Sequence, residues 1–341
     1  MHLLSLATPP LAEVTAPTLE TIATPGLWWA TIAAVVGFLI VDFIATRRPH
    51  EVSMREALGW SAFYVALPLA FGAYIVTRFG SERGLEYYAG YVVEKSLSVD
   101  NLFVFILLLA GFAVPRELRQ RVLLYGIVGA LLMRAVFIAL GAAALAAFDW
   151  VFLIFGLVLV VTAVKILRDA VAGADHAVDV SSLRSVRLLR RFVPVTDSYE
   201  GTRLVTKVDG RRALTPLAVV VVAVLATDVV FAVDSVPAVY GITGDPYLVF
   251  ATNAFALLGL RALYFVLEGV LGTLVHLGYG LAAILAFIGA KLALHWAHLQ
   301  WPAVPEIPTT TSLIVVVAIL VVTTLTSLWA TRDARRESEL R

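Results

Sequence analysis

The chain has 341 residues, of which 60% are hydrophobic and 15% are charged. Soluble domains average roughly 45–50% apolar and about 25% charged residues, so this composition indicates an all-α polytopic membrane protein. The net charge of +1 gives no basis for a nucleic-acid partner, and the absence of cysteine excludes disulfides, thiolate zinc sites and a cysteine nucleophile.

Nine stretches of the chain are apolar enough to cross a lipid bilayer as helices, which takes about 20 residues each. They cover residues 27–46, 57–78, 86–113, 122–147, 149–167, 214–240, 247–268, 272–295 and 311–331. The segment before them, residues 1–26, contains no Lys or Arg and so lacks the basic start of a secretory signal. We expect this segment to be a short extracytoplasmic tail.

The distribution of Lys and Arg predicts the orientation, because cytoplasmic connections of membrane proteins are enriched in both. With the N-terminus outside, the first, third and fifth connections and the C-terminal tail lie in the cytoplasm. They hold three, three, nine and four of the 26 Lys and Arg residues, whereas the opposite side holds only Arg78 and Arg83. We therefore expect a multi-pass protein of a bacterial-type cytoplasmic (inner) membrane, with a cytoplasmic C-terminus.

The fifth connection, residues 168–213, is the only long polar one. It carries Asp175, His176 and Asp179 ahead of a basic segment. A regulatory or metal-sensing loop is one reading, but one His beside two Asp is not a metal signature. A solvated, positively charged linker is the plainer interpretation.

Two of the apolar stretches contain carboxylates. Residues 94–101 read Glu-Lys-Ser-Leu-Ser-Val-Asp-Asn, and residues 227–237 contain Asp228 and Asp234, the latter followed by Ser235. In each stretch the two acids stand six residues apart. A carboxylate in hydrocarbon costs at least a few kcal/mol, so such acids usually pair or mark an ion path.

The two acidic stretches begin two similar halves of the chain. The matching pairs are Glu94 with Asp228, Asp100 with Asp234, Arg134 with Arg261, and Lys165 with Lys291. Each half has three spans, and because three is odd the second half enters the membrane from the opposite side. This predicts an inverted 3+3 helix repeat, an architecture in which transporters place the substrate near the midplane.

The repeat divides the chain into six parts. They are the tail (1–26), two N-terminal transmembrane helices (27–83), a first repeat of three helices (84–167), the cytoplasmic loop (168–213), a second repeat of three helices (214–295), and the last helix with the cytoplasmic tail (296–341).

We expect the acidic stretches to form one buried site for a hard divalent cation. The candidate ligands are Glu94, Asp100, Asn101, Asp228, Asp234 and Ser235. Their oxygens suit Mn²⁺, Ca²⁺ or Mg²⁺. Six residues turn a helix by about 600°, so two acids of one stretch lie roughly 120° apart on a continuous helix. Either the helix breaks locally, or each half directs one acid to the central site and the other to a neighbour. A break near Pro237 would also free carbonyls. The alternative is that each acid forms only a salt bridge between helices.

Basic residues near the site have supporting roles in this interpretation. We expect Arg134 and Arg261 to pair with acids or backbone and to neutralise an empty site. Lys95 could compete with the ion as an internal counter-ion. Lys165 and Lys291 lie near span ends and are expected to reach the membrane surface.

Three further polar residues have two readings each. Ser96 and Ser98 could ligate the ion or bond a backbone carbonyl one turn back. Asp42, near the end of the first span and outside the repeat, could be a proton-relay acid or, more simply, a charge at the cytoplasmic edge.

The sequence resembles the TerC/Alx family of integral membrane proteins. The resemblance lies in GYVVEKSLSVDNLFVF (Gly90–Phe105), ATDVVFAVDSVPAV (Ala226–Val239) and NAFALLGLRALYF (Asn253–Phe265), and more loosely in IVDFIATRR (Ile40–Arg48). It extends from the first span to the last. It implies a nine-span bundle of the wider LysE-like transporter group and Mn²⁺ export linked to metal or pH homeostasis.

The resemblance carries over the acids Glu94, Asp100, Asp228 and Asp234. Members of the family often have a Glu three residues before the first Asp of the second motif, and this chain has Leu225 there. This departure leaves open whether the metal is bound or coupled in the same way.

The function expected from the sequence is a secondary transporter that exports Mn²⁺, with protons as a further partner. Closely packed carboxylates bind a shared proton when the metal leaves, which favours proton exchange. The alternatives are an intramembrane sensor or scaffold for metal or pH stress and, less favoured, an intramembrane aspartyl enzyme built on Asp100 and Asp234.

Overall fold

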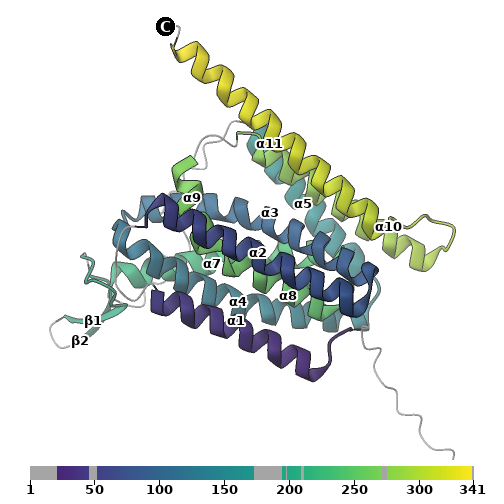
Figure 1. Cartoon of the computed structure of the whole chain (residues 1–341), viewed down its shortest axis with the longest axis horizontal. Coiled ribbons are helices and arrows are strands. Elements are labelled where there is room, and N and C mark those ends of the chain that lie inside the picture. Colours follow the sequence, from purple (N-terminus) through teal and green to yellow (C-terminus); the bar gives the residue numbers. More distant parts are fainter. Residues whose placement is uncertain are drawn as a thin grey trace, which may run out of the picture.

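The computed structural model describes residues 21–45, 52–172, 194–196, 198–208, 211–270 and 275–339. Within these ranges the chain is almost entirely helical (Figure 1). The helices are α1 (Pro25–Ala45), α2 (Met54–Phe79), α3 (Ser81–Gly111), α4 (Arg116–Ala147), α5 (Val151–Val171), α7 (Pro216–Tyr240), α8 (Pro246–Leu258), α9 (Leu260–Val270), α10 (Leu277–Gln300) and α11 (Thr309–Glu339). The prediction of an all-α polytopic membrane protein is confirmed.

Seven of the described helices are long and apolar enough to cross a membrane, and an eighth span results if α8 and α9 are counted together. The seven are α1, α2, α4, α5, α7, α10 and α11. Helix α3 has 31 residues, which is more than a span requires, but Glu94, Lys95 and Asp100 make it less apolar. The count of nine spans and the inverted repeat stay predictions.

Helix starts are encoded locally. Ser53, Thr215 and Asp245 precede α2, α7 and α8, and each side chain accepts a hydrogen bond from a backbone N–H of the first turn. Proline follows at the first position of α7 and α8, where its missing N–H costs no helical hydrogen bond. In the second half of the chain, these signals fix the start of α7, which carries Asp228, and of α8, which carries Asn253.

The break in the bundle lies outside the two acidic helices, for which a local break was one of two alternatives. Neither α3 nor α7 is interrupted, although α7 contains Pro237. Instead, the predicted span 247–268 divides at Gly259 into α8 and α9, which meet at a bend of 45°. A Cβ at Gly259 would lie 2.9 Å from Cβ of Tyr64 and 3.1 Å from Nζ of Lys95, so close approach from α2 and α3 requires glycine there.

The two predicted halves interleave rather than forming separate bundles. Helices α3 and α4 both pack against α7 and α8, and α5 packs along α10 (Figure 1). The α5–α10 contact depends on Gly156 and Gly289, because a Cβ on either one would lie 2.8 Å from the carbonyl oxygen of the other. Small residues permit this kind of close helix packing in membranes.

The remaining helices lie at the periphery. Helices α1 and α2 both contact α8, and α2 also packs on α3 and α9. Helix α11 leans on α10 and α3, and its C-terminal end projects beyond the bundle (Figure 1). The many exposed apolar side chains of α1, α5 and α11 fit contact with lipid.

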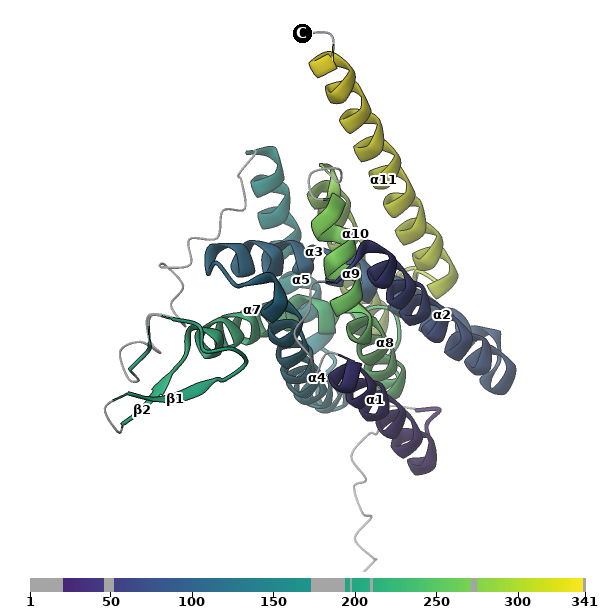
Figure 2. The ribbon, with the colours of Figure 1, turned by 60° about the vertical axis from the view of Figure 1, so that its left-hand side comes forward.

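The structure describes part of the predicted cytoplasmic loop 168–213. Strands β1 (Val205–Val208) and β2 (Arg211–Leu214) pair in antiparallel fashion and project to one side of the helices (Figure 2). Tyr199 ties this region to α3 by donating a hydrogen bond to the Phe112 carbonyl at 2.8 Å. The Asp175–Asp179 segment lies outside the described residues, as does most of the predicted tail 1–26.

Candidate ion site at Arg134

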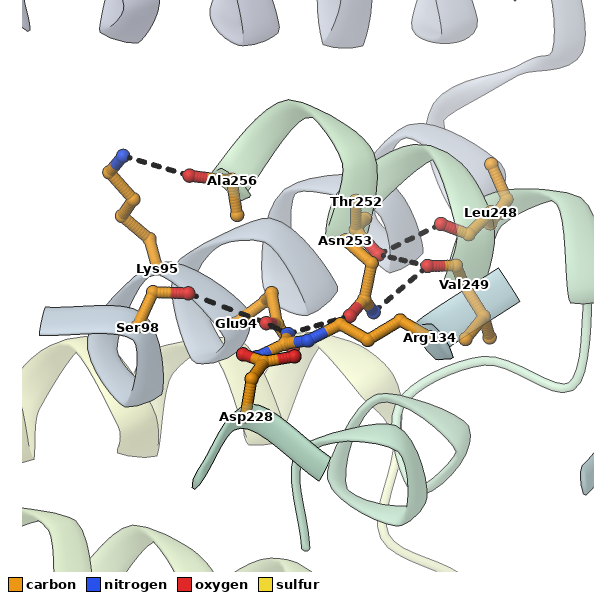
Figure 3. A network of polar contacts seen from close by, with 10 residues as sticks. All are labelled: Glu94, Lys95, Ser98, Arg134, Asp228, Leu248, Val249, Thr252, Asn253 and Ala256. Carbon is orange, nitrogen blue, oxygen red and sulfur yellow. Dashed lines mark hydrogen bonds and ion pairs between the residues drawn. The ribbon is translucent and has the colours of Figure 1, made fainter. Parts of the chain in front are cut away.

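The centre of the bundle holds a buried guanidinium with acids on two helices. Arg134 of α4 is 1% exposed and forms ion pairs with Glu94 of α3 and Asp228 of α7 (Figure 3). Its Nη2 lies 3.3 Å from Oδ1 of Asp228, and its Nη1 donates to Oδ1 of Asn253 of α8 at 2.9 Å. Residues from four helices, two in each predicted half, therefore meet at one cation.

Close packing between α4 and α7 brings Arg134 to Asp228. A Cβ at Gly126 would meet the Val224 side chain, and one at Gly129 would meet the Leu225 side chain, so these glycines let the helices approach. Residue numbers increase along both helices from the Gly126–Val224 contact to the Gly129–Leu225 contact. The Arg134–Asp228 ion pair follows in the same direction. The sequence positions of two glycines thus place an arginine against an acid of the other half.

Second contacts orient the groups that bind Arg134. The Nδ2 of Asn253 donates to the Val249 carbonyl at 3.1 Å, which leaves its Oδ1 to accept from Arg134 (Figure 3). Ser98, one turn after Glu94, donates to Oε1 of Glu94 at 3.4 Å. The carboxylate and the amide are held in place before any ligand arrives.

Several buried polar atoms of the site have no hydrogen-bond partner among the described residues. They include Oε2 of Glu94, Oδ2 of Asp228, Nε of Arg134, Nδ2 of Asn101 and Oγ of Ser235. Buried polar atoms normally have partners, and exceptions often mark a place for water or an ion. Each of the two acids thus uses one oxygen for Arg134 or its neighbours and keeps the other free.

The six predicted ligands are not all described as one cluster. Glu94, Asp228, Asn101 and Ser235 are buried, whereas Asp234 is partly exposed. The backbone of Asp100 lies in α3, but its side chain lies outside the described part of the structure. Among the described residues, no three His, Asp or Glu side chains converge in the way that metal ligands do.

Of the two serines with open readings, Ser96 bonds back along its own helix. Its Oγ donates to the Val92 carbonyl at 2.6 Å, one turn earlier. Ser98 instead supports Glu94, as described above. Because each hydroxyl donates its proton in these contacts, its oxygen lone pairs could still face an ion. Ser96 therefore matches the reading of a bond to a backbone carbonyl one turn back.

Arg261 forms a second buried network. Its Nη2 lies 2.9 Å from Oδ1 of Asp42 in α1, and its Nη1 lies 3.4 Å from Oε1 of Gln120 in α4. The Tyr64 hydroxyl of α2 donates to the same Asp42 oxygen at 2.9 Å. Asp42 is 1% exposed and is an internal partner of Arg261, close to the start of α4, where Gln120 follows Arg119. Both readings of Asp42, a proton-relay acid and a charge at the cytoplasmic edge, stay predictions.

Tyr64, Gln120 and Asn253 are the residues of these networks that the sequence reasoning did not single out. Asn253 carried a signal, because it begins one of the family-like motifs and stands eight residues before Arg261. Tyr64 and Gln120 carried none: Tyr64 lies in an apolar stretch, and Gln120 stands among the arginines of a predicted cytoplasmic connection.

A family model described as the integral membrane protein TerC family matches residues 79–335 of the chain. The chain belongs to the TerC family. The match begins just before α3 and includes both acidic stretches, Arg134 and Arg261, but not Asp42.

Similar proteins occur in several bacteria. This TerC protein is 41% identical to the uncharacterized membrane protein Rv2723 of Mycobacterium tuberculosis over 92% of the chain and 82% of the relative. It is 41% identical to the uncharacterized membrane protein STKORF319 of Myxococcus xanthus over 81% of the chain and 86% of the relative. It is 38% identical to Escherichia coli K12 Alx, named provisionally as a membrane-bound redox modulator, over 91% of the chain and 97% of the relative. No solved structure matches.

Leu225 of this TerC protein occupies the position where a Glu was expected from the resemblance. Its side chain packs over Gly129, where an added Cβ would clash with Cδ2 of Leu225. The position faces α4 one turn before Asp228, so it belongs to the surroundings of Arg134. In this chain an apolar contact stands where a further carboxylate would approach the site.

Lys291 and Lys165, which match in the repeat, have different surroundings. Lys165 is exposed, as expected for a residue that reaches the membrane surface. Lys291 is only 8% exposed and lines a cavity of about 540 Å³ together with Glu86, His295 and Glu306. The cavity is lined by the start of α3, the end of α7 with the connection after it, and the start of α11. The expectation that Lys291 reaches the membrane surface stays a prediction.

Proposed function

We propose that this TerC protein is a secondary transporter that exports Mn²⁺ from the cytoplasm by alternating access, in exchange for protons. The observation that carries the proposal is the shared cation of α3 and α7: Glu94 and Asp228 bind one guanidinium in the bundle interior. Acids from two segments that lie 134 residues apart thus act together on one positive charge. Transporters built from inverted repeats hold their substrates between the two repeats in this way.

In this proposal Arg134 stands in for the transported ion when the site is empty. Two buried carboxylates without a counter-charge would be strongly destabilised, and the guanidinium removes that penalty. A divalent ion and a guanidinium a few ångströms apart would repel each other. Loading of Mn²⁺ therefore requires Arg134 to withdraw from Glu94, Asp228 or both.

The unpartnered oxygens are the first ligands available to an entering ion. Oε2 of Glu94, Oδ2 of Asp228 and Oγ of Ser235 are hard oxygen donors, which suits Mn²⁺ and leaves Ca²⁺ and Mg²⁺ as related substrates. Asp100, Asn101 and Asp234 would complete the shell when the helices rearrange. On release, the carboxylates take up protons or the Arg134 guanidinium, which provides the exchange.

The orientation follows from the charge distribution. We place the protein in a bacterial inner membrane with the N-terminus outside and the C-terminus in the cytoplasm. Because the chain has no cysteine, single cysteines can report this directly. An impermeant maleimide added to intact cells should label Thr24→Cys and leave Ser198→Cys unlabelled, and the reverse pattern would contradict the placement.

Other functional classes find less support at the site. An aspartyl enzyme uses two carboxylates that share one proton. The two carboxylates that the structure brings together, Glu94 and Asp228, have Arg134 between them. The enzyme reading was built on Asp100 and Asp234 instead, and the side chain of Asp100 lies outside the described part of the structure. The Escherichia coli relative is named for redox modulation. Thiol chemistry in this chain could not provide it, since there is no cysteine. A scaffold or sensor would tolerate loss of the buried acids.

Inside-out vesicles provide the test of transport. Asp100→Asn and Asp234→Asn should each abolish Mn²⁺ accumulation, measured with a fluorescent Mn²⁺ indicator, while the protein stays folded in the membrane. Glu82→Gln is a matched control, because Glu82 is an exposed acid of α3, and it should transport normally. Normal transport by both Asp variants would contradict the proposal, and peptide cleavage by the purified protein would favour the enzyme.

A further inference from the structure

The ammonium group of Lys95, a residue of α3, binds the broken span α8–α9 close to its bend. Nζ of Lys95, from α3, donates a hydrogen bond to the Ala256 carbonyl at 3.2 Å (Figure 3). Ala256 lies in the last turn of α8, directly before the bend at Gly259. The carbonyls of the last helical turn lack partners within the helix and carry the negative end of the helix dipole.

The surroundings of this ammonium are shaped to hold it. Lys95 is partly buried, and a Cβ at Gly259 would lie 3.1 Å from Nζ. The same Cβ would lie 2.9 Å from Cβ of Tyr64, whose hydroxyl also bonds Asp42. The break is therefore enclosed by side chains from α2 and α3, and the glycine leaves room for a positive group.

We propose that the break at Gly259 is a binding site for a small monovalent cation, which this chain fills with the Lys95 ammonium. Free carbonyls at the end of a half-helix are the groups with which transporters coordinate ions such as Na⁺. A tethered ammonium in that position holds α8 and α9 at their bend and needs no sodium from solution. Lys95 thus acts as a positioning residue for the span that carries Asn253 and Arg261.

The site is separate from the Arg134 centre, although the two adjoin. Glu94 and Lys95 are consecutive, so their side chains leave α3 about 100° apart. Glu94 turns to Arg134, and Lys95 turns to the Ala256 carbonyl (Figure 3). One turn of α3 thereby connects the candidate ion site to the bend in α8–α9.

Two substitutions of Lys95 distinguish a cation site from a simple packing contact. Lys95→Ala removes the ammonium and leaves space, whereas Lys95→Met removes the charge and fills the space. The full chain in detergent is heated in choline chloride, sodium chloride or methylammonium chloride. We expect Na⁺ or methylammonium to raise the melting temperature of Lys95→Ala relative to choline, and to leave the wild type and Lys95→Met unchanged.

Transport gives a second reading, which rests on the proposed function. In choline, Lys95→Ala should transport Mn²⁺ about tenfold more slowly than the wild type, the scale expected for one lost hydrogen bond to a charged group. Sodium or methylammonium should restore most of that rate. Wild-type transport should be the same in all three salts.

Each result decides the inference. Equal responses of Lys95→Ala and Lys95→Met to the salts, or a Lys95→Ala protein that no salt stabilises, would overturn the site. Salt-dependent melting of Lys95→Ala in a protein whose wild type moves no Mn²⁺ would keep the site and reject the proposed function.

Discussion

Arg134 and Arg261 occupy matching positions of the predicted repeat, but their partners differ in kind. Arg134 binds Glu94 and Asp228, which begin the two halves, and Asn253. Arg261 binds Asp42 and Gln120, and Asp42 comes from α1, outside the repeat. Equivalent residues have therefore taken different tasks: one neutralises candidate ion ligands, and the other fastens an added helix to the second half.

The difference teaches that residues at matching positions of the predicted repeat can have unlike partners when one partner comes from an N-terminal helix outside it. Arg261 pairs with Asp42 of α1, and Asp228 pairs with Arg134. The candidate ion site is therefore shared by α3, α4, α7 and α8. Substitutions at the two arginines should separate ion binding from helix assembly.

The largest effect is expected for Arg134→Met. It leaves Glu94 and Asp228 without their cation, and loss of one partner of a buried ion pair costs about 3–5 kcal/mol. Unfolding in detergent should show this loss, and saturating Mn²⁺ should recover more stability in Arg134→Met than in the wild type. The triple variant with Glu94→Gln and Asp228→Asn is the control and should regain stability without Mn²⁺. Wild-type stability in Arg134→Met would contradict the assigned role.

A smaller loss is expected for Arg261→Met. Asp42 keeps the Tyr64 hydroxyl as a donor, so the unfolding free energy should fall by about 2–3 kcal/mol. Because Asp42 is not a candidate ligand, Mn²⁺ should not restore the loss, whereas the added substitution Asp42→Asn should. If Mn²⁺ restored the stability of Arg261→Met as much as that of Arg134→Met, the two networks would have the same role.

The spans, the acids and the interior arginines follow from composition and spacing, because charges in apolar stretches need partners in the bundle. Asp42 could not be assigned, since its partner lies 219 residues away and outside the repeat. The bend at Gly259 could not be located either. The bend depends on Tyr64 of α2 and Lys95 of α3 lying against Gly259. The sequence of residues 247–268 does not predict these contacts. The low exposure of Lys291 could not be predicted for the same reason, because the residues that line its cavity come from segments distant in the sequence.

The smallest effect is expected for Tyr64→Phe. It removes one hydrogen bond to Asp42 and should lower the unfolding free energy by about 1–2 kcal/mol, with Mn²⁺ binding unchanged. Tyr88→Phe is the matched control, because its hydroxyl donates to the Leu69 carbonyl at an exposed position, and its loss should stay within about 0.5 kcal/mol. A Tyr64→Phe protein that loses Mn²⁺ binding would join the Arg261 network to the ion site.

Titration of the purified protein with Mn²⁺, followed by electron paramagnetic resonance of the free ion, tests the Arg134 site most directly. Wild type should bind Mn²⁺, Arg134→Met should bind it at least about tenfold more tightly because the competing cation is gone, and Glu94→Gln with Asp228→Asn should not bind it. Equal binding by the wild type and the double variant would contradict the claim that these two acids hold the transported ion.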